Sequence, residues 1–310
     1  MRNYKRRRFG DGECMHIYQR SVKGFNLFYD QEDFIVFYTI VSVLTKVYKV
    51  VLMEMCLMVD HVHLLVSSES LEEMSAFVRH YTSLYVMESN NDIGRKGPLF
   101  HKSFGSAPKV GSKKIRSAIV YVGNNPVEKK LCRYAEQYRW NFLAYMKDDA
   151  PFSTFIRYQD RSKSLCRALK EVRSMAAANK YLSHAHVRRL LGNFNGNEKD
   201  FLVDYIVSRF FSFDRDALLS YYESHDEMLH AMSSTAGSEY DIKETFHSGS
   251  DSVYADMADV VRNEFRIVPV RQVVVQSAEN KLHIAGILKR KTSATKMQIA
   301  KFLHMDASGA

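Results

Sequence analysis

The chain has 310 residues, of which 46% are hydrophobic and 25% charged, and its formal net charge at pH 7 is +9. This length is sufficient for one large domain or two ordinary ones with substantial cores. No apolar stretch is long enough to span a bilayer, and no secretory core follows the basic start at residues 1–8, which argues against a membrane or secreted protein. We expect a cytoplasmic protein with neither a disulfide nor a zinc site, because no CxxC spacing occurs among Cys14, Cys56, Cys132 and Cys166.

The first part of the chain alternates between strand-like and helix-like patterns. Period-two alternation and short apolar runs predict strands, whereas broad apolar stripes that follow acidic or serine residues predict helices. The predicted order is a strand at 14–21, a helix at 34–49, strands at 50–57 and 61–66, a helix at 71–89, a loop at 90–94, a strand at 104–110 and a helix from 113. This order is typical of an α+β sandwich with an antiparallel sheet of the ferredoxin-like kind.

Two histidines begin the second strand of the predicted hairpin, as His61-Val62-His63 after a tight turn at Val59-Asp60. Because successive side chains on a strand point to opposite faces, the two imidazoles share one face while Val62 enters the core. Paired imidazoles on a sheet face can bind a divalent metal ion, and one further ligand would complete a catalytic site. The structural alternative is a pair of half-exposed histidines beside a hairpin turn.

Tyr121 and Asn125 lie near the end of the helix that is predicted from Lys113. Residues four apart on a helix are neighbours, so the phenol and the amide would lie side by side. Pro126 disfavours helical geometry at Asn125, and we therefore predict that the helix ends there. The structural alternative is an interfacial tyrosine and a turn-forming asparagine before a proline.

Positive charge is concentrated between residues 95 and 139, where eleven Lys or Arg residues stand against two Glu residues. This segment alone has a net charge of +9, which equals the excess of the whole chain. A block this lopsided indicates a polyanionic partner, and a merely soluble basic surface is the alternative. Aromatic residues suited to stacking on the bases of a single strand are interleaved with the block: Phe100, Phe104, Tyr121, Tyr134, Tyr138 and Trp140.

Taken in order, these motifs resemble the single-tyrosine HUH transposases and, in pattern, the REP-associated tyrosine transposases of the IS200-like family. The resemblance rests on His61-Val62-His63 after a strand, on Gly97-Pro98-Leu99-Phe100-His101-Lys102 in the basic segment, and on Tyr121 leading into Asn125-Pro126-Val127. The segment from Ile17 to Asp30 also resembles the first strand and loop of that family. The similar region covers roughly residues 10–145.

The resemblance implies a ferredoxin-like or RRM-like HUH nuclease fold that cleaves and rejoins single-stranded DNA through a covalent 5′-phosphotyrosine, at hairpin or repeat sequences. By position, His61 and His63 match the metal pair, Tyr121 matches the nucleophile, and Asn125 stands where the family has a third polar ligand. Mg²⁺ or Mn²⁺ would be the metal ion. The protein would be located in the bacterial cytoplasm, in association with the nucleoid. Asp60 departs from the family, which more often has asparagine there, and adds negative charge beside the metal site.

Four basic residues flank the implied site and are our candidates for contacts with the DNA backbone: Lys102, Lys113, Lys114 and Arg116. The sequence does not determine whether Tyr121 acts in its own subunit or in that of a homodimer partner. Two other functions fit the same motifs. One is a domesticated DNA-binding regulator with little catalysis, and the other is an unrelated metal-binding module that interacts with RNA.

The second half of the chain is predicted to be an all-α region. We divide the chain into a nuclease domain at 1–148, a helical region at 149–232, a polar linker at 233–252 and a small helical module at 253–310. The run from Lys289 to Leu303 resembles the first part of a helix-turn-helix, as it occurs in tails of related transposases. Only seven residues follow, too few for a recognition helix, so the run either docks or binds backbone, or is no helix-turn-helix at all.

Overall fold

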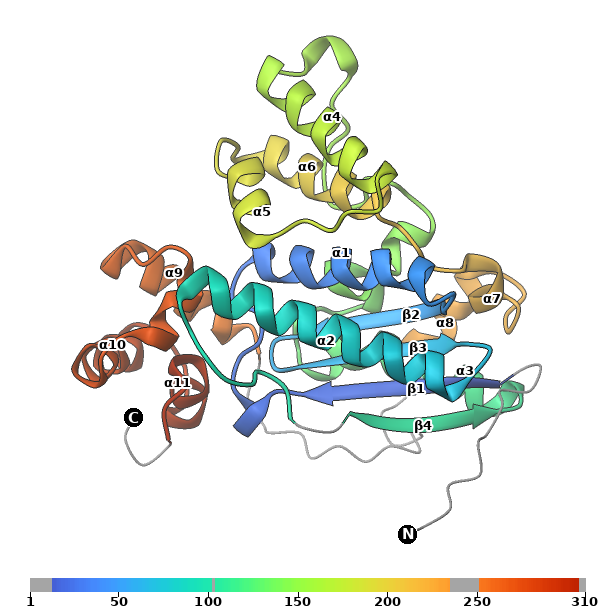
Figure 1. Ribbon diagram of the computed structural model, residues 1–310, viewed down its shortest axis with the longest axis horizontal. Helices are drawn as coiled ribbons and strands as arrows, with labels where there is room; N and C mark the ends of the chain where they lie inside the picture. The colour runs from blue at the N-terminus through green and yellow to red at the C-terminus, as the bar shows by residue number, and fades with distance from the viewer. Residues whose placement is uncertain (1–12, 102–103, 235–250, 307–310) are drawn as a thin grey trace.

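The computed structural model describes residues 13–101, 104–234 and 251–306 (Figure 1). At its centre is a four-stranded antiparallel sheet in the order β2-β3-β1-β4. The strands are β1 (Glu13–Arg20), β2 (Val51–Met58), β3 (His61–Ser67) and β4 (Gly105–Val110). This sheet, with its helices and the helical region that follows, confirms the predicted α+β class.

Helices cover both faces of the sheet. α1 (Gln31–Val47) and α2 (Leu71–Ile93) pack together on one face, where the Tyr81 hydroxyl of α2 donates a hydrogen bond to the Gln19 side chain of β1 at 2.6 Å. α3 (Ser112–Glu128) lies across the other face and contacts all four strands. The pleat of β1 therefore directs its odd-numbered side chains to α1 and α2, and its even-numbered ones to α3.

Two of the predicted helix ends are wrong. α2 continues through residues 90–93, which were predicted to be a loop, and stops at Gly94, whose left-handed φ of 68° suits a helix C-terminus. α3 continues beyond Pro126 instead of ending at Asn125. The amide group of the Asn125 side chain donates to the Tyr121 carbonyl at 3.1 Å, next to the Val122 carbonyl that loses its helical donor to the proline.

Five helices follow in the second half of the chain. They are α4 (Lys163–Ala177), α5 (His184–Leu191), α6 (Gly196–Arg209), α7 (Arg215–Leu219) and α8 (His225–Ser234). α5 and α6 contact α1, whereas α8 contacts α3 (Figure 1). Their buried apolar side chains join those of the sheet in one hydrophobic cluster. The predicted division of the chain after residue 148 stays a prediction. Within the described ranges, no helix combines the length and the apolar character needed to cross a membrane.

Residues 251–306 form a C-terminal module with a hydrophobic cluster of its own. It contains α9 (Val253–Phe265), a 3-10 segment (Val270–Val275), α10 (Ala278–Lys291) and α11 (Lys296–Leu303). α11 lies against the loop that follows β1, where the Tyr29 hydroxyl donates to the Phe302 carbonyl at 2.7 Å. This contact favours docking as the role of the run that resembles a helix-turn-helix. Most of the predicted linker, residues 235–250, lies outside the described residues.

One buried arginine joins the C-terminal module to α1 and α2. Arg271 is 4% exposed and forms ion pairs with Asp33, in the first turn of α1, and with Asp92, in the last turn of α2, the latter at 2.5 Å. Burial alone would raise the pKa of Asp33, but the charge of Arg271 and the hydrogen bond with His184 outweigh it and hold that pKa below its ordinary value. The arginine therefore compensates carboxylates that water does not reach.

We expect Arg271→Met to lower the free energy of unfolding by about 3–5 kcal/mol, because the buried Asp33 carboxylate would remain without its arginine, whereas Asp92 would keep its pair with Arg188. Urea denaturation followed by circular dichroism measures this difference. Lys291→Met is the matched control, since its ion pair with Glu264 at 2.5 Å is about half exposed. Its loss should cost no more than about 1 kcal/mol. Equal losses in the two variants would contradict the role assigned to Arg271.

Candidate active site

β3 presents His61 and His63 on the face of the sheet that α3 covers. Their ring centroids are 5.0 Å apart and their planes nearly perpendicular, at 84°. The two side chains share one face, as the strand pattern predicted. They are not half-exposed, because His61 is 5% and His63 1% exposed. Two imidazoles are therefore withdrawn from water at the start of a central strand.

A third histidine, which the sequence motifs did not single out, lies on the same face. The Nε2 atom of His16, on β1, is 2.9 Å from Nδ1 of His63, and both side chains are almost completely buried. Burial, and then the charge of Lys109, lowers the pKa of His16 to about 3. Burial also holds the pKa of His63 well below its ordinary value. Both imidazoles are therefore neutral at neutral pH, which is the form that binds a metal ion.

Each ring nitrogen atom of His61 lies near an oxygen atom of a side chain. Its Nδ1 is 2.6 Å from Oδ1 of Asp60, and its Nε2 is 3.4 Å from Oδ1 of Asn125. The Asn125 amide nitrogen is engaged by the Tyr121 carbonyl, which turns the amide oxygen toward the histidine. When Nδ1 donates its proton to Asp60, the lone pair on Nε2 faces the lone pairs of the Asn125 oxygen. Such an electron-rich gap suits a cation.

Tyr121 reaches these histidines from α3. Its ring centroid is 5.5 Å from that of His63 and 5.6 Å from that of His16. The fold therefore brings Tyr121, Asn125 and the two motif histidines to one place on the sheet. Their assignment as nucleophile and metal ligands stays a prediction. The phenol is 2% exposed, so this cluster is closed to solvent.

The donor atoms of this cluster fit a divalent metal ion. Two ligand atoms about 2.1 Å from a common cation lie about 3.0–3.5 Å apart, and the separation of 3.4 Å between His61 Nε2 and Asn125 Oδ1 falls in that range. Nε2 of His63 is buried and has no hydrogen-bond partner among the described residues. Among the described residues, no group of three or more His, Cys, Asp or Glu side chains could hold a metal ion.

The basic residues predicted to contact DNA differ in their surroundings. Lys113 and Lys114, in the first turn of α3, are exposed. Arg116 forms an ion pair with Glu227 at 2.9 Å, and its guanidinium lies 4.6 Å from the centre of the Tyr222 ring. Lys102 lies outside the described residues. The two lysines are therefore the candidates with freely accessible charge, and the contacts with DNA stay predictions.

Several aromatic residues of the basic block belong to the core. Phe100, Tyr121 and Trp140 are 3%, 2% and 7% exposed, so the prediction that they offer stacking surfaces is wrong for this folded state. Part of the positive charge is also internal, because Arg139 pairs with the buried Asp204 at 2.7 Å. The count of charged residues along the sequence therefore did not distinguish buried, paired cations from accessible ones in this segment.

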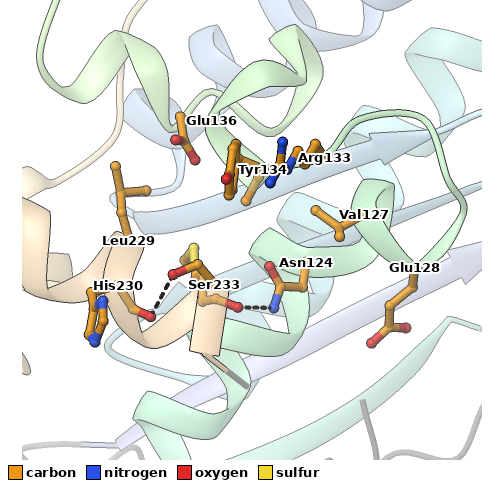
Figure 2. Close-up of a pocket in the computed structure, with 11 residues that line it drawn as sticks. Asn124, Val127, Glu128, Arg133, Tyr134, Glu136, Leu229, His230 and Ser233 are labelled. Atoms are coloured by element: carbon orange, nitrogen blue, oxygen red, sulfur yellow. Dashed lines mark hydrogen bonds between the residues drawn. The ribbon is translucent and has the colours of Figure 1, made fainter. Parts of the chain in front are cut away.

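A cavity of about 400 Å³ lies between α3 and α8 and is lined by neither the two motif histidines nor Tyr121 and Asn125 (Figure 2). Asn124 and Glu128 of α3 border it on one side, and His230 and Ser233 of α8 border it on the other. The Asn124 amide donates to the Met232 carbonyl at 2.8 Å. This hydrogen bond ties α8 to the helix that carries the tyrosine.

We expect His16→Phe to lower the free energy of unfolding by about 1–3 kcal/mol, because it leaves Nδ1 of the buried His63 without its partner. Urea denaturation measures the change. His80→Phe is the matched control. Nδ1 of His80 forms a hydrogen bond with the Tyr48 hydroxyl at 3.0 Å, but the pair is half-buried, so water can take the place of the lost imidazole. A His16→Phe protein as stable as the unchanged one would show that the pair of histidines contributes nothing to folding.

The comparisons with known proteins concern the same part of the chain. Residues 16–125 match the family model described as "Transposase IS200 like", and this range includes the histidine pair, Tyr121 and Asn125. No curated protein matches. A solved structure entitled "Structure of the REP associates tyrosine transposase bound to a REP hairpin" aligns with 53% of this chain and 98% of its own, at 11% identity and a TM-score of 0.39. The family match confirms the resemblance drawn from the motifs: residues 16–125 are similar to the IS200-like transposases.

Proposed function

We propose that this chain is a transposase that cleaves and rejoins single-stranded DNA through a covalent 5′-phosphotyrosine. The observation that carries the proposal is the meeting of Tyr121 with His61, His63 and Asn125 on one face of the sheet. The match to the IS200-like family over the same residues supports a transposase. Hairpin or repeat sequences are the proposed targets, and a homodimer is compatible with the proposal.

In the proposed step, the phenolic oxygen of Tyr121 attacks a backbone phosphorus. The bond between the phenolic oxygen and phosphorus forms, the bond to the 3′-oxygen breaks, and the phenol proton passes to water. The departing 3′-oxygen takes up a proton and becomes a free hydroxyl. One ester replaces another, so a second 3′-hydroxyl can attack the phosphotyrosine, release Tyr121 and join two strands without ATP.

His61, His63 and Asn125 are the proposed ligands for Mg²⁺ or Mn²⁺, and two imidazoles suit the softer Mn²⁺. When bound, the ion supplies positive charge that polarises the phosphate and neutralises the departing oxygen. The role of the protein in this step is to hold these ligands in place. Asp60 bonds to Nδ1 of His61, and His16 bonds to Nδ1 of His63, which directs the Nε2 atoms away from these partners.

The enclosure of Tyr121 limits access to the proposed nucleophile. Leu131 and Tyr138 pack against the cluster around it, and the Tyr138 hydroxyl is fixed to the Leu57 carbonyl at 2.8 Å. A DNA strand can reach the phenol only after this cover moves. The same enclosure favours a second candidate function, a DNA-binding regulator with little catalysis. The two functions differ in whether a covalent adduct with DNA forms.

We expect Tyr121→Phe to reduce nicking of a single-stranded hairpin oligonucleotide on the order of 10³-fold or more, because the attacking oxygen is gone. DNA binding should stay within about twofold, since the proposed binding energy comes mainly from cations on the phosphates and the lost hydroxyl is neutral. With a 3′-labelled oligonucleotide and Mn²⁺, a denaturing gel should show a protein–DNA adduct only when residue 121 is tyrosine.

Tyr81→Phe is the matched control for this experiment. Tyr81 is a buried tyrosine with a bonded hydroxyl on the opposite face of the sheet, and its variant should retain the adduct. Nicking by Tyr121→Phe at the normal rate would refute the nucleophile. Absence of any adduct with the unchanged protein, together with tight DNA binding, would favour the regulator.

Binding of single-stranded DNA should weaken with salt in proportion to the phosphates that are neutralised. If Lys113 and Lys114 each neutralise one phosphate, Lys113→Gln/Lys114→Gln should reduce the log–log slope by about 1.4. Arg116→Gln should change it by less than about 0.7, because that guanidinium already has a carboxylate partner. Fluorescence anisotropy over a range of NaCl concentrations measures the slopes. An unchanged slope in the double variant would remove the two lysines from the DNA path.

A further inference from the structure

One side chain of the C-terminal module lies close to Asp60, the residue next to His61. Lys301, on α11, places Nζ 3.8 Å from Oδ2 of Asp60, and the two side chains are only 19% and 27% exposed. The other carboxylate oxygen of Asp60 is 2.6 Å from Nδ1 of His61. A single carboxylate therefore links a lysine near the end of the chain to a proposed metal ligand.

The path of the Lys301 side chain is fixed by the docking of α11. The Lys301 carbonyl accepts a hydrogen bond from the backbone of Asn26 at 3.4 Å, and the next carbonyl, that of Phe302, accepts from the Tyr29 hydroxyl at 2.7 Å. The lysine then passes closely over Gly24, where an added Cβ would lie 3.4 Å from Cε. The loop after β1 thus guides the ammonium group to the carboxylate.

The module also holds both elements that carry the cluster. Val59, in the β2–β3 turn beside Asp60, belongs to the hydrophobic cluster of the module, and its carbonyl accepts from Leu27 at 2.7 Å. At the start of the module, the backbone of Asp251 donates to the carbonyl of Lys129, the residue that follows α3, at 3.3 Å. The histidine turn and the end of the tyrosine helix are therefore both in contact with the module.

We propose that Lys301 is a positioning residue for His61. It holds the Asp60 carboxylate against Nδ1 of His61, so that Nε2 keeps its lone pair and stays directed at Asn125, ready for a divalent cation. This inference rests on the proposed function and makes the C-terminal module a part of the site. An ammonium group that acted only through space would repel the cation, so its removal would strengthen metal binding. A positioning role predicts the opposite, that its removal weakens metal binding.

The test is calorimetric titration of the full-length protein with Mn²⁺ in the absence of DNA, so that cleavage has no part in the result. Positioning predicts that Lys301→Met weakens Mn²⁺ binding about 10-fold. Lys301→Arg should restore most of the affinity, and Lys301→Met should have no further effect when Asp60→Asn is already present. Lys23→Met is the matched control, because Lys23 pairs with Asp306 at 2.7 Å across the same junction without reaching Asp60, and it should bind Mn²⁺ normally.

A second measurement needs no metal ion. In nitrogen NMR spectra of histidine-labelled protein, His61 should carry its proton on Nδ1, and Lys301→Met should give a mixture of both tautomers. Tighter or unchanged Mn²⁺ binding by Lys301→Met, an equal change in the Asp60→Asn background, or an unaltered tautomer would each overturn the positioning role. An unchanged protein that binds no Mn²⁺, yet loses its single tautomer on Lys301→Met, would instead refute the metal in the proposed function and leave the positioning role standing.

Discussion

The close approach of α3 to a polar sheet face is the constraint on which the candidate site depends. His16, His63 and Glu54 are all buried there, and burial raises the pKa of Glu54 well above its ordinary value, which keeps that carboxyl group neutral. Gly123 lets α3 lie close to both α8 and the sheet, because a Cβ at this position would lie 2.6 Å from Cε of Met232 on α8 and 3.1 Å from Oε1 of Glu54. A larger residue there would have to displace Met232 or α3 itself.

Because the cluster is withdrawn from water, protein groups rather than solvent fix the orientation of its histidine rings. Two of the three histidines are bonded at Nδ1, His61 by Asp60 and His63 by His16, so that their Nε2 atoms remain for other ligands. The same enclosure leaves Tyr121 2% exposed. The fixed orientation of the imidazoles and the enclosure of the Tyr121 phenol therefore have one physical origin. In the proposed reaction, a DNA strand reaches the phenol only after the cover moves.

Charges inside the protein, rather than apolar contact alone, join the C-terminal module to the remainder of the described chain. Two arginines of the module form ion pairs with acidic residues at the start of α1. Asp33 pairs with Arg271, and Asp30 pairs with Arg262 at 2.5 Å. These carboxylates also favour the N-terminal end of the helix dipole. A third pair, Lys301 with Asp60, lies next to the histidine cluster. The module is thus bound by contacts of the kind that also shape the site.

The sequence by itself determined the strands and helices around the site, the shared face of His61 and His63, and the proximity of Tyr121 to Asn125, because periods of 2.0 and 3.6 residues are local properties of the backbone. It did not determine that α3 passes through Pro126, because helix continuation was settled by local hydrogen bonds around the proline. It did not determine that His16 lies next to His63, because strand register depends on long-range pairing. The contact of Lys301 with Asp60 spans most of the chain and was equally invisible. Only tertiary packing decides which residues distant in sequence become neighbours, and which charges and aromatic rings it buries.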